Sequence, residues 1–214
     1  MELYSFFRSS AAYRVRIALN LKGIDPKTHV VHLRRGGGEQ FTPAYRDINP
    51  QASVPTIVED GTALSQSLAI IEYLDETRPE PALLPADPMA RAQARAIALA
   101  IACDIHPLNN LRVLKRLADM GISAADRDAW YRHWAETGLS AVDEMVRRFD
   151  GAGAFIHGAQ PGLADICLVP QLYNARRLSS DLSGCARLLD IERRCLELPA
   201  FALAAPEVQP DAED

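Results

Sequence analysis

Near the start of the chain, the pattern of hydrophobic and polar positions changes from that of a strand to that of a helix. Leu3–Phe7 is a short apolar run typical of a strand, and the residues after it place Val15, Ala18 and Leu19 on one face of a helix. Thr28–Leu33 is short and contains β-branched residues, which favours a second strand. We therefore expect a strand, a helix and a strand in this order.

A β-hairpin and another helix are predicted to follow. Asp60-Gly61 is a strong signal for a two-residue turn between two short strands. A short helix is expected before it, around Pro43–Asp47, and an amphipathic helix after it, over Ser67–Glu76. This order of elements is that of a thioredoxin-like α/β domain, which we place at residues 1–80.

The second half of the chain carries only helical patterns, so we predict an all-α domain over residues 87–214. Asp87-Pro88 pairs an N-cap residue with a proline at the first helical position. The alanine-rich stretch that follows favours a helix. Pro107 is expected to kink this helix, because proline cannot donate a backbone N–H.

Further helices are predicted over Leu163–Leu178 and Ala186–Leu196. A stripe of large side chains at roughly helical intervals is expected to face the core or an interface: Trp130, Trp134, Ala141, Met145 and Phe149. Gly138 is expected to allow close packing of its helix. The acidic tail after Pro206 contains proline and is expected to be frayed.

Composition limits the classes of function. The chain has 214 residues, 48% of them hydrophobic, which is enough for one sizeable core or two smaller domains. No segment has the roughly 20 apolar residues of a membrane helix, and the start does not resemble a signal peptide. A net charge of −5 argues against a general nucleic-acid binder, which needs a basic surface. We expect a cytoplasmic protein without a membrane or nucleic-acid partner.

The cysteines show neither a CxxC motif nor the spacing of metal ligands; they are Cys103, Cys167, Cys185 and Cys195. Reduced thiols in a cytoplasmic protein are the simplest account of this pattern. We therefore expect no metal.

Ser9 and Ser10 stand where the first helix is expected to begin. A hydroxyl at that position caps backbone N–H groups that lack a partner within the helix. The same position favours a bound anion such as a thiolate, because the free N–H groups and the helix dipole attract negative charge. From these residues alone, both interpretations stay open.

Four segments, taken in order, resemble the zeta-class glutathione transferases, which include the maleylacetoacetate and maleylpyruvate isomerases. They are Phe6–Leu19, Asn49–Thr56, Gln66–Leu74 and Leu163–Gln171. A fifth segment, Asp104–Asn110, extends the resemblance over nearly the whole chain. Any one motif alone is weak, but four in the same order are specific. The resemblance implies glutathione transferase architecture, with a thioredoxin-like domain before a helical domain.

The resemblance implies that glutathione is the cofactor and that Ser9 holds its thiolate, with Ser10 capping or assisting. It implies a cis bond at Pro55, with the Val54 backbone pairing with the cysteinyl backbone of glutathione. An ordinary trans proline entering a strand is the alternative. Ala11 departs from the family, which carries a cysteine or threonine there, so no second hydroxyl or thiol is expected to assist the thiolate.

The two ends of glutathione have separate expected contacts. Gln66 and Ser67, at the start of a helix, are expected to hold a carboxylate, which the resemblance implies is the γ-glutamyl end; capping of the helix alone is the alternative. Gln40 resembles a residue that reaches the glycyl end, and it fits a solvated loop residue equally well. The resemblance implies that three residues of the helical domain also contact the cofactor: Asp104, His106 and Asn109. For His106, a role within an interface is the alternative, and Asp104 is expected to reach the glutathione of a partner subunit.

Arg8 and Arg177 are expected to bind the substrate. A positive charge is unfavourable at a helix start, and a substrate with carboxylates would explain Arg8; a solvated residue or a member of a salt bridge is the alternative. Arg177 shares a helical face with Pro170 and Asn174, and the resemblance places it at the mouth of the active site, with Arg176 pointing elsewhere. Two guanidinium groups bind a dicarboxylate through charge-assisted hydrogen bonds.

Asp165 resembles the buried capping residue of the glutathione transferase fold and is expected to be structural. Gly162 stands where the family usually has serine or threonine. Glycine is tolerated at an N-cap at a cost of only a few tenths of a kcal/mol, so we expect the helix to form.

The expected activity is glutathione-dependent cis–trans isomerisation in aromatic compound catabolism, by a homodimer. The substrate would be maleylpyruvate, giving fumarylpyruvate, or maleylacetoacetate, giving fumarylacetoacetate. One alternative is a general glutathione S-transferase, which would favour an apolar second pocket. Another is a non-catalytic interaction protein with this fold, against which the intact Ser9, Val54-Pro55 and Gln66-Ser67 set argues.

Overall fold

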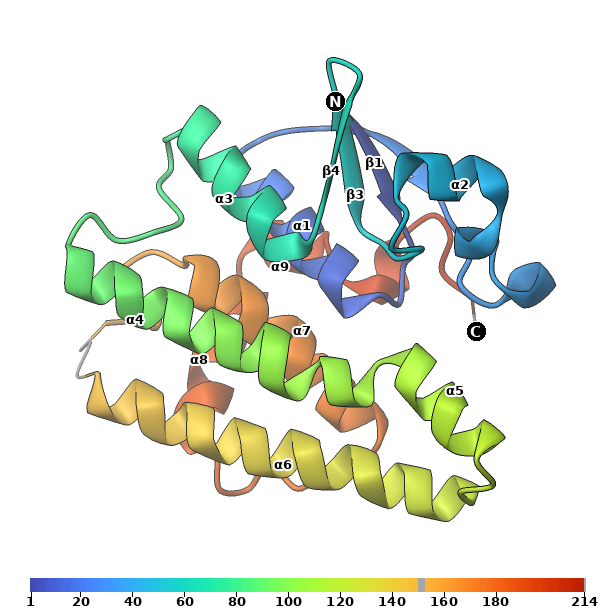
Figure 1. The fold of residues 1–214 in the computed structure, drawn as a ribbon. Coiled ribbons are helices and arrows are strands. Elements are labelled where there is room, and N and C mark those ends of the chain that lie inside the picture. The colour runs from blue at the N-terminus through green and yellow to red at the C-terminus, as the bar shows by residue number, and fades with distance from the viewer. Residues whose placement is uncertain (150–152, 214) are drawn as a thin grey trace. The chain divides into compact units, whose positions relative to one another are not determined.

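The computed structural model describes residues 1–149 and 153–213. The chain forms two compact units (Figure 1). The first, the N-terminal unit, comprises Met1–Leu83 together with Leu196–Asp214. The second, the helical unit, comprises Leu84–Cys195. Residues 196–214 therefore pack with the N-terminal unit, whereas the sequence prediction placed them in the helical domain.

The N-terminal unit contains a four-stranded sheet in the order β2-β1-β3-β4. The strands are β1 (Glu2–Ser5), β2 (Lys27–Val30), β3 (Thr56–Glu59) and β4 (Thr62–Ser65). β1 is parallel to β2 and antiparallel to β3. The β3–β4 turn has positive φ at Asp60 (50°) and Gly61 (76°), as a two-residue hairpin turn with both central residues left-handed requires. The predicted hairpin is thus confirmed.

Helices cover both faces of this sheet (Figure 1). They are α1 (Ser10–Leu21), α2 (Pro43–Ile48) and α3 (Ser67–Thr77). α1 and α3 pack against each other on one face, and α2 lies on the other. This sequence of strands and helices is the thioredoxin-like order that was predicted. The short helix α9 (Pro199–Ala202) packs on α1 and so brings the C-terminal residues into this unit.

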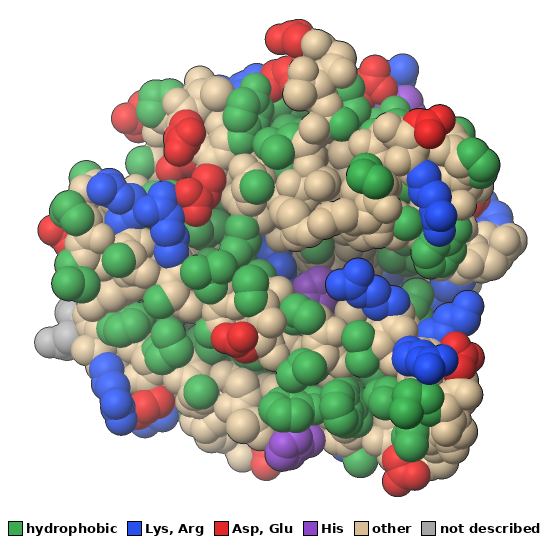
Figure 2. Space-filling view, viewed as in Figure 1, with side chains coloured by type: hydrophobic (Ala, Val, Ile, Leu, Met, Phe, Trp, Pro, Cys, Tyr) green, Lys and Arg blue, Asp and Glu red, His purple; other side chains and the backbone are tan. Residues whose placement is uncertain are grey.

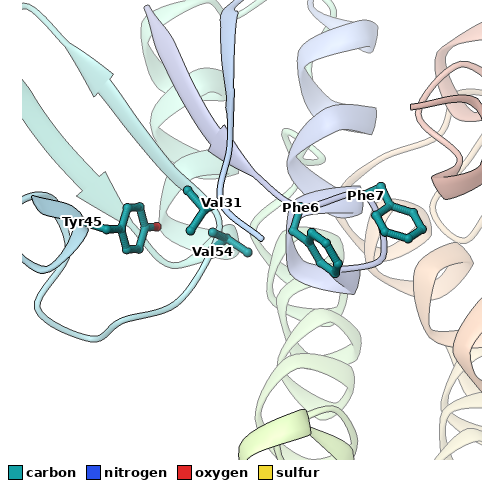
Figure 3. Close-up of a cluster of buried hydrophobic side chains, with 5 residues drawn as sticks. All are labelled: Phe6, Phe7, Val31, Tyr45 and Val54. Carbon is teal, nitrogen blue, oxygen red and sulfur yellow. The ribbon is translucent and has the colours of Figure 1, made fainter. Parts of the chain in front are cut away.

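A hydrophobic cluster of the N-terminal unit joins the end of β1 to the loop before β3. Its buried members are Phe6, Phe7, Val31, Tyr45 and Val54. Figure 3 shows Tyr45 pointing towards Val31 and Val54, with Phe6 and Phe7 beyond them. The Phe6 and Phe7 rings pack edge to face with centroids 4.8 Å apart. The cluster fixes two loops that carry predicted site residues.

In its described residues, the helical unit contains one long interrupted helix and four regular ones. Its elements are α4 (Pro88–Leu99), the π-helical segment η3 (Ala100–Ile105), the 3₁₀ segment η4 (Pro107–Asn109), α5 (Leu111–Asp119), α6 (Ala124–Arg148), α7 (Leu163–Arg177) and α8 (Ala186–Leu196). Asp87 caps α4 by accepting a hydrogen bond from the Ala90 N–H (2.8 Å). The helix changes to a 3₁₀ segment at Pro107, the residue at which a kink was predicted.

The buried face of α6 differs from the predicted stripe by one position. The residues that face the core are Tyr131, Ala135, Leu139, Val142 and Val146. Trp130 and Trp134 are only half-buried, and their rings meet edge to face at 5.7 Å. The face of α6 that carries the two tryptophans is therefore not the face that packs in the core of the unit. Gly138 packs as predicted, because a Cβ there would lie 2.4 Å from the Ile105 Cγ1 atom.

Apolar side chains are exposed at both ends of α5 in the helical unit. None of the residues of α5 is buried, and Leu111 and Met120 are exposed. Figure 2 shows hydrophobic side chains gathered over α5 and the first half of α6. In the residues that the structure describes, no helix combines the length and apolarity needed to cross a membrane. All four cysteines are free thiols.

Candidate functional site

The register of the sheet brings three predicted site segments to one end of it. Tyr4 pairs with Thr56, and Thr56 pairs with Ser65. The residues after β1, before β3 and after β4 consequently lie at the same end of the sheet. These residues are Arg8 and Ser9, Val54 and Pro55, and Gln66 and Ser67.

Ser9 is the N-cap of α1 and is partly exposed. Its Oγ accepts a hydrogen bond from the Ala12 N–H at 3.2 Å. A hydroxyl has one donor and two acceptor positions, so this capping bond uses only an acceptor position. The hydroxyl proton can therefore still be donated to an anion at the helix start. Ser10, by contrast, is buried in the first turn.

Arg8 precedes this cap and lies beside the C-terminal tail. Its guanidinium is over the Phe7 ring, 4.8 Å from the centroid, and its Nη2 donates to the Glu213 carbonyl oxygen at 3.5 Å. The side chain is partly exposed. A guanidinium next to a helix start is well placed to bind a carboxylate beside an anion that is held at the helix start.

The loop before β3 is held by buried polar side chains. The Val54–Pro55 peptide bond is cis, as the resemblance implied. The Ser53 carbonyl accepts hydrogen bonds from the Tyr45 hydroxyl (2.6 Å) and the Asn49 amide (2.8 Å). Burial raises the pKa of Tyr45, so its hydroxyl stays protonated and remains a donor. The backbone of Val54 is thus held in a fixed position.

The start of α3 combines a strained residue with a buried cation. Gln66 has φ 73°, an uncommon conformation for a residue with a side chain that costs about 1–3 kcal/mol. Its amide donates to the Gln51 Oε1 (2.8 Å) and does not cap the helix. Ser67 is buried, and its Oγ accepts from the Nη1 of Arg14 at 3.3 Å. Helix N–H groups and a guanidinium behind them suit a carboxylate.

Gln40 is buried, so it is not the solvated loop residue that the sequence left open. Its Nε2 donates to the Leu33 carbonyl at 3.3 Å, while its buried Oε1 has no partner among the described residues. Gly38 makes this placement possible, because a Cβ at that position would lie 2.6 Å from the Gln40 Nε2. The free acceptor suits an N–H donor rather than a carboxylate.

The predicted site residues of the helical unit fall in the interrupted segment. Asp104 is exposed in η3, and His106 is partly buried just after it. The Asn109 N–H donates to the His106 carbonyl at 3.1 Å, so the two side chains share a face of a 3₁₀ turn. Asn109 itself is buried and donates from Nδ2 to the Tyr131 carbonyl at 3.1 Å, which ties η4 to α6.

The two arginines at the end of α7 have different surroundings. Arg176 pairs through both guanidinium nitrogens with the buried Glu192 of α8. Arg177 is exposed, and its charge reaches Tyr131 of α6. Burial raises the pKa of Tyr131 to about 12, and the positive charge of Arg177 acts against that rise. Arg176 is therefore structural, whereas Arg177 is exposed at the surface of the unit.

Three polar residues around the site are absent from the sequence prediction. Arg14 and Arg16 of α1 are buried, and Asp211 of the tail accepts a hydrogen bond from the Phe7 N–H. A signal was present in the sequence, because the two arginines alternate with the apolar residues Val15 and Ile17 within a helix. Buried charged side chains need specific partners, so arginines within an apolar helix indicate a nearby polar network.

Comparison with known families agrees with this geometry. The family model for the glutathione S-transferase N-terminal domain matches residues 8–77, and the model for the C-terminal domain matches residues 128–199. A probable maleylacetoacetate isomerase from Vibrio cholerae serotype O1 is 49% identical over 211 residues, which cover 98% of this chain and 97% of that protein.

Solved structures extend the likeness to the whole fold. The holo structure of a maleyl pyruvate isomerase, described as a bacterial zeta-class glutathione-S-transferase, is 42% identical, with a TM-score of 0.96 and 100% of both chains covered. The maleylacetoacetate isomerase of Methylobacterium extorquens AM1 is 38% identical, with a TM-score of 0.95 and the same coverage. The chain therefore belongs to the glutathione S-transferase family, and these full-length relatives place it with the zeta-class maleylacetoacetate and maleylpyruvate isomerases.

Proposed function

We propose that this protein is a glutathione-dependent cis–trans isomerase of maleylpyruvate or maleylacetoacetate. The observation that carries the proposal is the start of α1, where the partly exposed hydroxyl of Ser9 follows the guanidinium of Arg8. One residue suits a thiolate and the other a substrate carboxylate. The structure of the relative from Methylobacterium extorquens AM1 is described with bound malonate and GSH, a dicarboxylate together with glutathione.

The N-terminal unit has a suitable group for each end of glutathione. We assign the γ-glutamyl carboxylate to Gln66, Ser67 and the start of α3, with the buried Arg14 donating to the Ser67 Oγ from behind. We assign the cysteinyl backbone to Val54, beside Pro55. The glycyl end is assigned to Gln40, whose buried Oε1 lacks a partner in the described part of the chain and suits the glycyl N–H.

Residues of the helical unit complete the proposed cofactor contacts. His106 and Asn109 share a face and are assigned to glutathione, with Ser10 supporting the start of α1. We further propose a homodimer in the cytoplasm, where the free cysteines stay reduced. The exposed Asp104 would then reach the glutathione bound by the partner subunit.

Ser9 stabilises the ionised form of the cofactor thiol. A free thiol has a pKa of about 8.5, so little of it is ionised at neutral pH. A hydrogen bond to a charged group contributes about 1.5–3 kcal/mol, and 1.36 kcal/mol corresponds to one pKa unit. Donation from the Ser9 hydroxyl, together with the dipole of α1, therefore lowers the thiol pKa by about one unit or more. Ser9 does not itself attack the substrate.

When bound, glutathione supplies the thiolate that adds reversibly to the cis double bond, so that the bond can rotate before the thiolate leaves. We assign the two carboxylates of the substrate to Arg8 and Arg177. Their guanidinium groups hold the substrate by charge-assisted hydrogen bonds and favour the negative charge that develops on its conjugated ketone. Glutathione is regenerated and is not consumed.

The direct test is to supply the purified protein with each cis substrate and a small fraction of one equivalent of glutathione. We expect complete conversion to the trans isomer, followed by ultraviolet absorbance and proton NMR, because the cofactor turns over. The faster substrate identifies the natural one. Conjugation of neutral electrophiles without isomerisation would indicate a general transferase, and absence of glutathione binding in calorimetry would indicate an interaction protein.

The adjacent arginines of α7 provide a matched pair for this assay. Arg177→Ala is expected to lower kcat/KM for the dicarboxylate by about 10–100-fold, since it removes a charged hydrogen-bond donor. Arg176→Ala removes an equal charge but breaks the pair with Glu192, so it should lower stability and leave kcat/KM nearly unchanged. Equal losses of activity in both variants would contradict the assignment of Arg177.

A further inference from the structure

We propose that Asp211 is a positioning residue of the active site, and that residues 209–213, the C-terminal strap, hold the turn that presents Arg8 and Ser9. The Asp211 Oδ2 accepts a hydrogen bond from the Phe7 N–H at 2.9 Å, across 204 residues of sequence. This tail was predicted to be frayed, and the structure contradicts that expectation. The inference rests on the proposed function, because it concerns the residue proposed to hold the thiolate.

The residues that the strap contacts form a tight turn. The Ser9 N–H donates to the Phe6 carbonyl at 3.0 Å, which makes Phe7 and Arg8 the central residues of a four-residue turn. Ser9 is at once the last residue of this turn and the N-cap of α1. Any rotation of the peptide between Phe6 and Phe7 would therefore move the Ser9 hydroxyl and the Arg8 guanidinium together.

Arg16 holds the same turn from the other side. Its Nη2 donates to the Phe7 carbonyl (2.9 Å) and its Nη1 to the Phe6 carbonyl (3.4 Å). Its Nε donates to the carbonyl of Ala204, just before the strap, at 2.9 Å. Both backbone groups of Phe7 are thus bound by side chains of opposite charge, a carboxylate on the N–H and a guanidinium on the carbonyl. Such bonds are shorter and stronger than neutral ones.

A second anchor keeps the strap in place beyond Asp211. The Glu213 carboxylate lies 3.1 Å from the His32 Nε2 and 3.1 Å from the Arg35 Nη2. The His32 Nδ1 accepts from the backbone N–H groups of Arg34 (3.2 Å) and Arg35 (2.7 Å), so its proton is on Nε2 and is donated to Glu213. The Glu213 carbonyl also accepts from Arg8.

These contacts give the strap a defined role. Its two acidic side chains are both occupied by donors of the chain, one at the turn and one after β2. It thereby connects the loop after β2 to the turn after β1. Glu213 contacts the Arg8 side chain through its carbonyl, whereas Asp211 is the residue of the strap that binds the backbone of the turn, at the Phe7 N–H.

The test compares Asp211→Ala with Asp211→Asn and with Asp47→Ala, an exposed acidic residue of α2 as control. The readouts are kcat, the dissociation constant for glutathione, and the pKa of the bound thiol from its thiolate absorbance. We expect Asp211→Ala to lower kcat by about tenfold, because small displacements of catalytic groups are costly. It should raise the thiol pKa and change glutathione affinity little. Asp211→Asn should have a kcat and a thiol pKa close to those of the wild-type protein, since its amide oxygen can still accept from the Phe7 N–H.

An unchanged thiol pKa and kcat in Asp211→Ala would overturn the proposal, even if that variant melted at a lower temperature. Equal impairment of Asp211→Asn and Asp211→Ala would also overturn it, because the acceptor would then not be the cause. Hydrogen exchange at the Phe7 amide gives an independent reading without glutathione. Faster exchange in Asp211→Ala supports the strap, whereas failure of the wild-type protein to bind glutathione counts against the proposed function alone.

Discussion

Ser9 combines two hydrogen-bonding tasks in one small side chain. It accepts from the Ala12 N–H as the cap of α1, and its proton is proposed to face the glutathione thiolate. The sequence left capping and anion binding as competing interpretations. The geometry makes them compatible, because they use different parts of the hydroxyl. Stability and catalysis can therefore be separated by substitution at this position.

Ser9→Gly and Ser9→Ala should differ in stability but not in catalysis. Glycine is a tolerated N-cap, so Ser9→Gly should lose only a few tenths of a kcal/mol of unfolding free energy, whereas Ser9→Ala should lose about 1 kcal/mol. Both remove the donor, so both should raise the pKa of bound glutathione by about one unit. Urea unfolding and thiolate absorbance measure the two effects. A normal thiol pKa in either variant would contradict the role given to Ser9.

At the scale of single residues, the sequence indicated most of the polar side chains that are exposed or lie at the start of a helix. The sequence placed Ser9 and Ser67 at helix starts, as the structure has them, because a helix start has a recognisable pattern. The contacts of Arg14 and Asp211 were not predicted, since their partners, Ser67 and Phe7, lie far away in the sequence. Periodicity describes which face an apolar residue takes, but it does not reveal a buried ion's partner.

Among the secondary-structure elements, α7 depends most on a buried carboxylate near its start. Asp165 accepts from the Gly162 N–H (2.9 Å) and the Ile156 N–H (3.0 Å), so it caps a helix whose N-cap residue has no side chain. This is the structural role that was predicted for it. Burial raises the pKa of Asp165 to about 6, although these N–H donors act in the opposite direction.

This raised pKa predicts how stability depends on pH. The Asp165 carboxyl has a pKa of 3.8 in an unfolded chain and of about 6 in the folded one. The folded protein therefore keeps this proton up to a higher pH than the unfolded chain does. Raising the pH between these values therefore favours unfolding, by up to about 3 kcal/mol for this group. Below pH 3.8 the carboxyl is protonated in both states, and the stability that this proton contributes is fully present.

Asp165→Asn removes this titration and isolates it. The unfolding free energy of the wild-type protein minus that of Asp165→Asn should fall as the pH rises from about 4 to about 7, as measured by urea unfolding. The substitution also loses one acceptor, which shifts the difference by a constant amount. A difference that stays level or grows with pH over this range would contradict the raised pKa.

The predicted elements were accurate where local signals were strong. The Asp60-Gly61 turn, the Asp87 cap and the break at Pro107 each have a cause within a few residues. The stripe of Trp130 and Trp134 was predicted to face the core or an interface, and the structure excludes the core, because the residues next to them are the ones buried. Tertiary packing decides between two apolar faces, and a single sequence does not contain that information.

For the whole molecule, the main difference between prediction and structure is the end of the chain. Residues 196–214 were expected to belong to the helical domain, but they pack with the N-terminal unit through α9 and the C-terminal strap. Their partners, such as Phe7 and Arg16, lie about two hundred residues earlier, as the separation of 204 between Phe7 and Asp211 shows. Such contacts have no local pattern, so the sequence suggested a frayed tail.

The central claim is that the start of α1 holds a glutathione thiolate beside a carboxylate-binding arginine. A crystal structure of the complex with glutathione measures this most directly. The account predicts the glutathione sulfur within hydrogen-bonding distance of the Ser9 Oγ, with the γ-glutamyl carboxylate at Ser67. A sulfur atom bound far from Ser9, with its tripeptide on another surface, would contradict it.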